Sequence, residues 1–230
     1  MNKQRLLLVL AICPSVVWGK ITPEINMPDN FSETQPAMDR LEGQYGDYNS
    51  VTNGGCGDVT FKDFTPKSYS TRKDGKNNSV YKGITLLYCD FENTEKNDEY
   101  GPDRFLPEKV YFDKKSETWK KKKYHLSKEE KKKSLRCYGI SDINDLQPVV
   151  LYNIKSVNAK GYAVINSNIP KEEKANGVKG KTISFCLIHN GDALCGYGPM
   201  VYTFDGKDID FSPYMLKSLE TFEMGRPKIR

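Results

Sequence analysis

The residues of this chain most capable of chemistry are six cysteines and two histidines. Cys186 and Cys195 lie on either side of Asn190-Gly191, a dipeptide that tolerates the positive φ angles of a type I′ turn. If these two residues form the loop, His189 faces Asp192. Cys186 then faces Cys195 at a non-hydrogen-bonded position, where paired Cα atoms are about 4.5 Å apart. The spacing predicts a hairpin with a cross-strand Cys186–Cys195 disulfide, and two reduced core cysteines are the alternative.

The other cysteines beyond the N-terminal segment are three in number and cannot all pair within one chain. Cys56 lies in a turn-rich stretch, and Cys89 ends an apolar run that begins at Ile84. We expect these two to pair, although spacing alone leaves the connectivity open. Cys137 is then the odd cysteine, and its apolar neighbours predict core filler. A nucleophile or a point of intermolecular linkage is the alternative for Cys137.

The histidines and carboxylates form no recognisable catalytic or metal motif. A catalytic triad needs a histidine held by a carboxylate beside a nucleophile, and His189 would have Asp192 opposite. At a turn, however, we expect His189 to be a solvated surface group. His125 lies among lysines, and the sequence has no Cys-x-x-Cys for zinc. The carboxylates of 205–210 lack the EF-hand order, so we expect a turn leading into a helix, with calcium as the alternative. The sequence therefore predicts no catalytic residue, metal or cofactor.

The charge of the chain is distributed unevenly. Residues 114–133 hold ten lysines against three glutamates, directly after an acidic stretch at 90–103. Arginine, which dominates bidentate recognition of phosphates and bases, is absent between Arg104 and Arg136, and this disfavours nucleic acid as a partner. The simplest interpretation is a solvated lysine face, and the functional one is a docking surface for an acidic protein. The candidate partner surface consists of Lys120, Lys121, Lys122, Lys123, Lys131, Lys132 and Lys133.

Residues 1–19 have the features of a secretory signal peptide. Lys3 and Arg5 precede a short apolar run, and Gly19 supplies a small residue before the predicted cleavage position. The run is shorter than the roughly 20 residues that cross a bilayer as a helix, so we expect no transmembrane segment. A lipid anchor at Cys13 is disfavoured because Ile12 stands where a small residue is expected. The features predict a bacterial protein that is periplasmic or secreted, where cysteines can oxidise.

The elements that would position these residues indicate an α+β fold. Residues 20–51 are expected to form an extended or loosely packed arm, and 52–230 an α+β domain that divides, as an alternative, into subdomains 52–140 and 141–230. The expected strands cover 59–61, 84–91, 110–112, a stretch around Trp119, and two hairpins at 149–165 and 182–204 joined by an exposed loop at 170–181. A Ser-x-x-Glu capping box at Ser127 predicts a surface helix over 128–134.

A C-terminal helix is the best-delimited element. Ser212 is the predicted cap, Pro213 suits the first turn, and Gly225 is the predicted stop. Its apolar stripe consists of Met215, Leu216, Leu219 and Phe222. Because such a stripe must be buried, the sequence predicts an antiparallel β-sheet of hairpins with the C-terminal helix packed on one face, stapled by disulfides.

These features together predict an exported, non-enzymatic envelope protein that binds another protein. Fourteen tyrosines and few catalytic groups suit protein recognition. The size, the export signal and the disulfides fit a periplasmic inhibitor or immunity-type protein. One alternative is a hydrolase of envelope polymers that uses carboxylates or Cys137, and another is an architectural component of the envelope.

Overall fold

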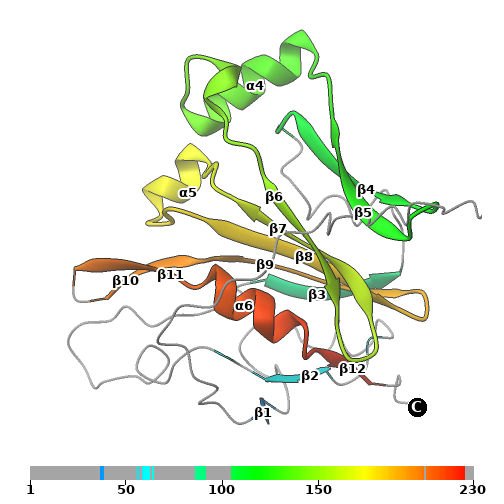
Figure 1. The fold of residues 1–230 in the computed structure, drawn as a ribbon. Helices are drawn as coiled ribbons and strands as arrows, with labels where there is room; N and C mark the ends of the chain where they lie inside the picture. The colour runs from blue at the N-terminus through cyan, green and yellow to red at the C-terminus, as the bar shows by residue number, and fades with distance from the viewer. Residues whose placement is uncertain are drawn as a thin grey trace, which may run out of the picture.

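The computed structural model of the chain describes residues 37–38, 56, 59–62, 64, 86–91, 105–204 and 206–225. The predicted signal peptide lies outside the described residues, as does the predicted arm apart from the two-residue strand β1 (Ala37–Met38). The described part is a mixed α+β structure of antiparallel hairpin sheets and short helices (Figure 1), as the sequence predicts.

A five-stranded antiparallel sheet is the largest sheet of the described structure (Figure 1). Its strands, in spatial order, are β3 (Leu86–Phe91), β9 (Asp192–Pro199), β8 (Thr182–His189), β7 (Lys160–Asn166) and β6 (Val150–Lys155). Both predicted hairpins are present. The predicted last strand, 193–204, is wrong in extent: β9 ends at Pro199, although the Met200 N–H still donates a 2.8 Å hydrogen bond to the Lys181 carbonyl. The next strand, β10 (Val201–Phe204), pairs with β11 (Lys207–Asp210).

The turn between β8 and β9 has the predicted geometry. Asn190 and Gly191 take φ angles of 51° and 85°, and His189 faces Asp192 across the turn. Cys186 lies directly opposite Cys195, with the two Cα atoms 4.1 Å apart and the sulfurs at disulfide-bonding distance. The two strands are therefore held in the register that the sequence predicts.

The second predicted cysteine pair is also present. Cys56 and Cys89 lie at disulfide-bonding distance, with their Cα atoms 6.0 Å apart. Because Cys89 belongs to the edge strand β3, this pair ties a segment distant in sequence to the edge of the sheet. Cys137 belongs to neither pair and packs, half-buried, against a cluster of core residues.

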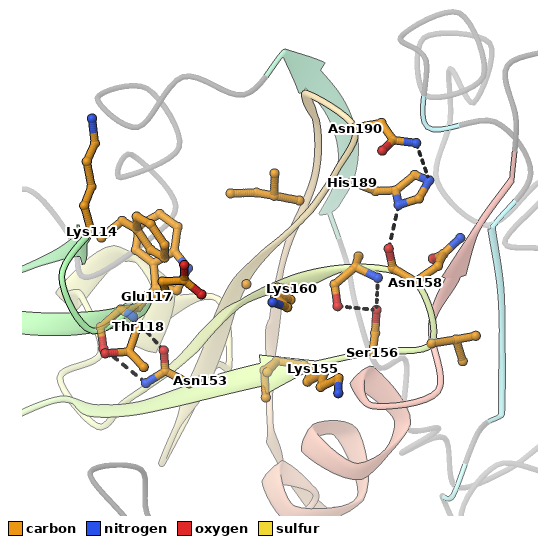
Figure 2. A pocket seen from close by; sticks show the side chains of 17 residues that line it. Lys114, Glu117, Thr118, Asn153, Lys155, Ser156, Asn158, Lys160, His189 and Asn190 are labelled. Carbon is orange, nitrogen blue, oxygen red and sulfur yellow. Dashed lines mark hydrogen bonds between the residues drawn. The ribbon is translucent and has the colours of Figure 1, made fainter. Parts of the chain in front are cut away.

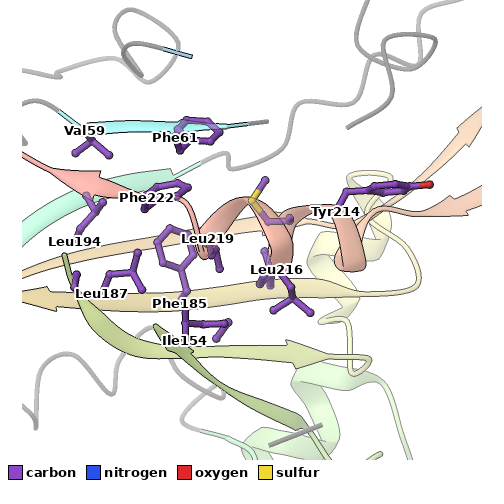
Figure 3. Packing of buried hydrophobic residues seen from close by; sticks show 14 of the residues in the cluster. Val59, Phe61, Ile154, Phe185, Leu187, Leu194, Tyr214, Leu216, Leu219 and Phe222 are labelled. Carbon is purple, nitrogen blue, oxygen red and sulfur yellow. The ribbon is translucent and has the colours of Figure 1, made fainter. Parts of the chain in front are cut away.

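One face of the sheet is covered by helix α6 (Ser212–Leu219) and a small sheet of β1, β2 (Val59–Lys62) and β12 (Glu223–Met224). Figure 3 shows Leu216 and Leu219 of the helix beside Phe185 of the sheet, and the three belong to one buried cluster. Phe222 stacks on Phe61 with ring centroids 4.6 Å apart. The helix thus buries its apolar stripe as expected from the pattern.

The predicted ends of this helix are wrong in detail. Ser212 is its first residue rather than its cap, because the first helical hydrogen bond, of 3.0 Å, runs from the Met215 N–H to the Phe211 carbonyl. The helix ends at Leu219 rather than near Gly225, because the chain turns after Leu219 and Glu223–Met224 pairs with β2 as a strand. Phe222 therefore packs from the segment that follows the helix.

The opposite face of the sheet carries the hairpin of β4 (Glu108–Asp113) and β5 (Thr118–Lys123) and the helix α4 (Lys128–Tyr138). Its core includes Val110, Trp119, Tyr162 and the Cys186–Cys195 pair. The predicted capping box is confirmed, since Ser127 and Glu130 exchange hydrogen bonds, although the helix continues to Tyr138. The 3-10 helix η2 (Ile143–Asp145) follows.

The predicted loop at 170–181 is partly wrong. It contains the short helix α5 (Lys171–Ala175), whose lysines, glutamates and alanine are good helix formers placed just after Pro170. The residues from Lys171 to Gly180 are largely exposed, as expected.

Candidate functional site

The ends of three hairpins enclose an open cavity of about 940 Å³ (Figure 2). The β4–β5 turn contributes residues from Phe112 to Trp119, the β6–β7 turn contributes 153–161, and the β8–β9 turn contributes 188–190. A volume of this size lies at the upper end of the range found for small-molecule sites, which is roughly 300 to 1,000 Å³. None of the sequence patterns predicts this cavity.

Asn153 fixes the β4–β5 hairpin at one side of the cavity. Its side-chain oxygen accepts a hydrogen bond of 2.6 Å from the Trp119 backbone N–H, and its side-chain NH₂ donates one of 3.1 Å to the Trp119 carbonyl. One amide thus satisfies both main-chain groups of a residue on a strand outside the central sheet (Figure 2). The Trp119 ring is buried, with its centroid 5.5 Å from that of Phe112 and 4.4 Å from that of Tyr162.

Two side chains and one backbone group hold the β6–β7 turn at the other side of the cavity. The Asn158 amide donates to the Met224 carbonyl at 2.7 Å and accepts from the Met224 N–H at 3.0 Å. The Val157 N–H donates to the Phe222 carbonyl at 3.1 Å, while the Val157 side chain remains 62% exposed. The Ser156 hydroxyl accepts a 3.1 Å hydrogen bond from the Ala159 N–H within the turn. An exposed apolar side chain is therefore presented on a turn whose backbone is fixed.

The charged residues of the cavity are mostly basic. Lys155 and Lys160 are directly opposite each other in the β6–β7 pair, and Lys114 comes from the β4–β5 turn. Glu117 is the one carboxylate among the described residues of the lining. Like charges directly opposite each other on antiparallel strands destabilise the pair. Lys155 and Lys160 form no ion pair with another described residue, so their repulsion is not offset within that part of the chain.

The β4–β5 turn that carries Lys114 is ordered by Asp113. This carboxylate pairs with Lys120 and accepts hydrogen bonds from the Ser116 hydroxyl at 2.7 Å and the Lys115 N–H at 3.1 Å. These interactions, the one with Lys120 being the largest, lower the pKa of Asp113 to about 2. The turn also places Glu117 at a φ angle of 51°.

The predicted lysine surface is divided by the structure. Lys120 pairs with Asp113, while Lys121 pairs with Glu108 at 3.1 Å and donates to the Val149 carbonyl at 2.6 Å. These two lysines therefore support the hairpin itself. The remaining predicted lysines are exposed and form no ion pair with another described residue: Lys122 and Lys123 on β5, and Lys131, Lys132 and Lys133 on α4.

Two of the remaining lysines line a second, smaller depression of about 320 Å³. Lys123 reaches it from β5 and Lys131 from α4, and His125 and Tyr124 lie between them in sequence. The Tyr124 hydroxyl donates a 3.0 Å hydrogen bond to Glu130, which raises the pKa of Tyr124. The pKa of Glu130 is lowered, chiefly by the Ser127 backbone N–H and then by the Ser127 hydroxyl. We refer to Lys122, Lys123, Lys131, Lys132, Lys133 and His125 as the basic face.

The expectation for His189 is wrong in one respect. Its ring is half-buried rather than fully solvated, because Nδ1 lies 2.5 Å from the Asn158 carbonyl and Nε2 lies 2.9 Å from the Asn190 side-chain nitrogen. The ring is thus held by the neighbouring turn (Figure 2), even though Asp192 faces His189 in the strand register as predicted.

The carboxylates of 208–210 are part of the β10–β11 hairpin. Asp208 pairs with Lys179 at 2.7 Å, and Asp210 pairs with Lys181 while accepting from the Ser212 N–H. The hydrogen bond from Lys179 is the main cause that lowers the pKa of Asp208. Within the described residues these carboxylates are used in ion pairs and at the start of α6, and no group of three potential metal ligands is present there.

Comparison with known proteins gives no relative. No family model matches the chain, and neither the curated proteins nor the solved structures contain a significant match. In the part of the chain that the structure describes, no helix has the length and apolar character needed to cross a membrane.

Proposed function

We propose that this chain is an exported, non-enzymatic binding protein of the bacterial envelope whose basic face docks an acidic partner protein. The observation that carries the proposal is the convergence of Lys123 and Lys131 on one depression from two different elements. Lys123 comes from the edge of a hairpin and Lys131 from a helix that begins with a full capping box. Both elements are ordered by hydrogen bonds and ion pairs, so the charges are presented on a fixed surface.

The chemistry of the depression favours an acidic protein segment over a metal or a nucleic acid. Its positive groups are accompanied by Tyr124, Ile143 and Leu146, a mixture of charge and apolar surface typical of protein recognition. Glu108, the carboxylate in the lining, is already paired with Lys121. Complementary charge at such a site mainly raises the association rate and the specificity of binding. A periplasmic inhibitor or immunity-type protein is the particular form of this function that we favour.

The experiment compares the partner proteins captured by the wild type with those captured by a variant in which two lysines of the basic face are replaced by glutamate. The exported protein is immobilised, and envelope and culture fractions are passed over the wild type and over a Lys123→Glu/Lys131→Glu variant. The control is Lys174→Glu/Lys207→Glu, which reverses two exposed lysines outside the basic face. We expect an acidic protein that binds the wild type and the control but binds the basic-face variant at least tenfold more weakly, with an affinity that falls as salt rises.

Two results would reject the proposal. In one, the captured protein binds the basic-face variant as tightly as the wild type. In the other, no partner is recovered and the purified protein hydrolyses a cell-wall polymer. The second result would instead support the hydrolase, which needs two converging acids or an activated Cys137.

A further inference from the structure

The cavity at the three hairpin ends and the basic face lie at opposite ends of β5, since Trp119 is near its beginning and Lys123 is its last residue. Its size, its lining and its charge differ from what docking of a protein surface requires. We propose that this cavity binds a small amphiphilic anion, with the negative group between Lys155 and Lys160 and the apolar body against Phe112 and Trp119. This inference does not depend on the proposed function of the basic face.

The position of the negative group follows from the strand register. Lys155 ends β6 and Lys160 begins β7, and the pairing places them directly opposite each other beside the four-residue turn. Two ammonium groups in this position repel each other, and a bound anion would convert the repulsion into two attractions. Figure 2 shows both lysines at the cavity, with Lys114 and Glu117 on the β4–β5 turn across from them.

The apolar body of the ligand follows from the rest of the lining. Phe112 is 38% exposed and lines the cavity together with Trp119, Ile188 and the 62% exposed Val157. Phe112 and Val157 thus present exposed apolar surface at the cavity, and the buried Trp119 packs beside Phe112. A purely polar anion would leave them uncovered, and an uncharged apolar molecule would leave the lysine pair unneutralised. Both halves of the site are satisfied by one molecule that has an apolar body and an anionic group.

The site is preformed because each of its three walls is fixed by side chain–backbone hydrogen bonds. Asn153 holds the Trp119 backbone, Asn158 holds the Met224 backbone, and His189 contacts the Asn158 carbonyl. A preformed cavity binds without the free-energy cost of ordering loops. Binding should therefore be detectable with a small synthetic probe as well as with the natural ligand.

The probe is 1-anilinonaphthalene-8-sulfonate, whose fluorescence rises in apolar sites, and its matched uncharged analogue is N-phenyl-1-naphthylamine. We expect the sulfonate to bind the folded exported protein with at least tenfold higher affinity than the analogue. Energy transfer from tryptophan places the probe, because Trp18 lies in the predicted signal peptide and Trp119 is the other tryptophan of the chain. Equal affinity for the two probes would overturn the proposal, since it would show an apolar cavity without anion selection.

The variants are Lys155→Gln and Lys160→Gln, with Lys174→Gln on α5, outside both the cavity and the basic face, as the control of equal charge change. Each cavity variant should bind 1-anilinonaphthalene-8-sulfonate roughly threefold to fivefold more weakly than the wild type, as expected for the loss of one partly exposed positive charge. The control variant should bind the probe as tightly as the wild type. Without any ligand, each cavity variant should melt about 1 to 3 °C higher than the wild type, because the like-charge pair is removed. Unchanged affinity in both cavity variants would overturn the proposal.

Competition identifies the class of the natural ligand. Dodecanoate and naphthalene-1-sulfonate are each titrated against the bound probe. Displacement of the probe by dodecanoate alone indicates that the natural ligand is an alkyl carboxylate. Displacement by naphthalene-1-sulfonate alone indicates an aromatic anion. Displacement by neither would overturn the inference, because the probe would then be held in a way that amphiphilic anions do not share.

Discussion

Asn153→Ala should detach the β4–β5 hairpin from the central sheet. The substitution removes both hydrogen bonds to the Trp119 backbone, of 2.6 and 3.1 Å, and leaves an N–H and a carbonyl without that partner at the back of the cavity. An unsatisfied buried polar group costs about 1 to 3 kcal/mol, but the open cavity lets water reach part of the site. We therefore expect a loss of about 2 to 3 kcal/mol in the free energy of unfolding. For a domain of this size, the loss corresponds to a fall of roughly 5 to 10 °C in Tm.

The measurement is thermal unfolding of residues 20–230, in which Trp119 is the one tryptophan, followed by circular dichroism and by Trp119 fluorescence. In Asn153→Ala the Trp119 emission should shift to longer wavelength before the main transition, because the hairpin opens locally and exposes a ring that is 4% exposed in the native structure. Asn153→Asp is the matched variant, since it keeps an acceptor for the Trp119 N–H but loses the donor to the Trp119 carbonyl. Its Tm should lie between those of the wild type and Asn153→Ala. If Asn153→Ala melts within about 1 °C of the wild type with unchanged emission, the amide does not anchor the hairpin.

Three further predictions concern the strands and the β4–β5 turn. Replacing Cys186 and Cys195 together by alanine should lower the free energy of unfolding by about 2 to 4 kcal/mol, measured by urea denaturation under non-reducing conditions; a loss below about 1 kcal/mol would contradict the cross-link. Gly161→Ala should reduce the yield of folded protein strongly, because a Cβ there would overlap the Cys186 carbonyl of the neighbouring strand, whereas Gly191→Ala meets only the strain of its positive φ. The pKa of Asp113, lowered to about 2 chiefly by Lys120, means that its stabilising effect is present above its unfolded pKa near 4 and is lost as pH falls toward 2. Asp113→Asn should therefore flatten the pH dependence of Tm between about pH 4 and 2, and an unaltered acid limb would argue against the turn network.

The hairpins could be predicted because their signals are local. Asn190-Gly191 specifies both the turn type and the register, and that register places Cys186 opposite Cys195. The capping box at Ser127 likewise specifies a helix start through residues three apart. In each case the residues that form the contact are close in sequence, and their types have few alternative uses.

The cavity could not be predicted because its walls depend on contacts between distant residues. Asn153 and Trp119 are 34 residues apart, and Asn158 and Met224 are 66 apart. A single sequence gives no sign that an asparagine at a strand position will bond the backbone of a particular distant residue. One local feature lies close to the turn, however. The register of the β6–β7 pair places Lys155 and Lys160 opposite each other, and the prediction of this hairpin assigned no register to its strands.

The asparagines at two of the walls also explain how a cavity can persist beside the β4–β5 hairpin, which belongs to a sheet separate from the five-stranded one. Asn153 joins β6 to β5, and Asn158 joins the β6–β7 turn to β12, so each amide acts as one rung of a backbone ladder where the strands are not adjacent. Continuous pairing of β5 with β6 would bring the hairpin against the sheet and close the space that Lys155 and Lys160 now face. The Asn153 amide instead fixes the distance between β5 and β6 at one point and leaves the two strands free to diverge beyond it. The two asparagines, both of which line the cavity, therefore help to fix the distance between its walls.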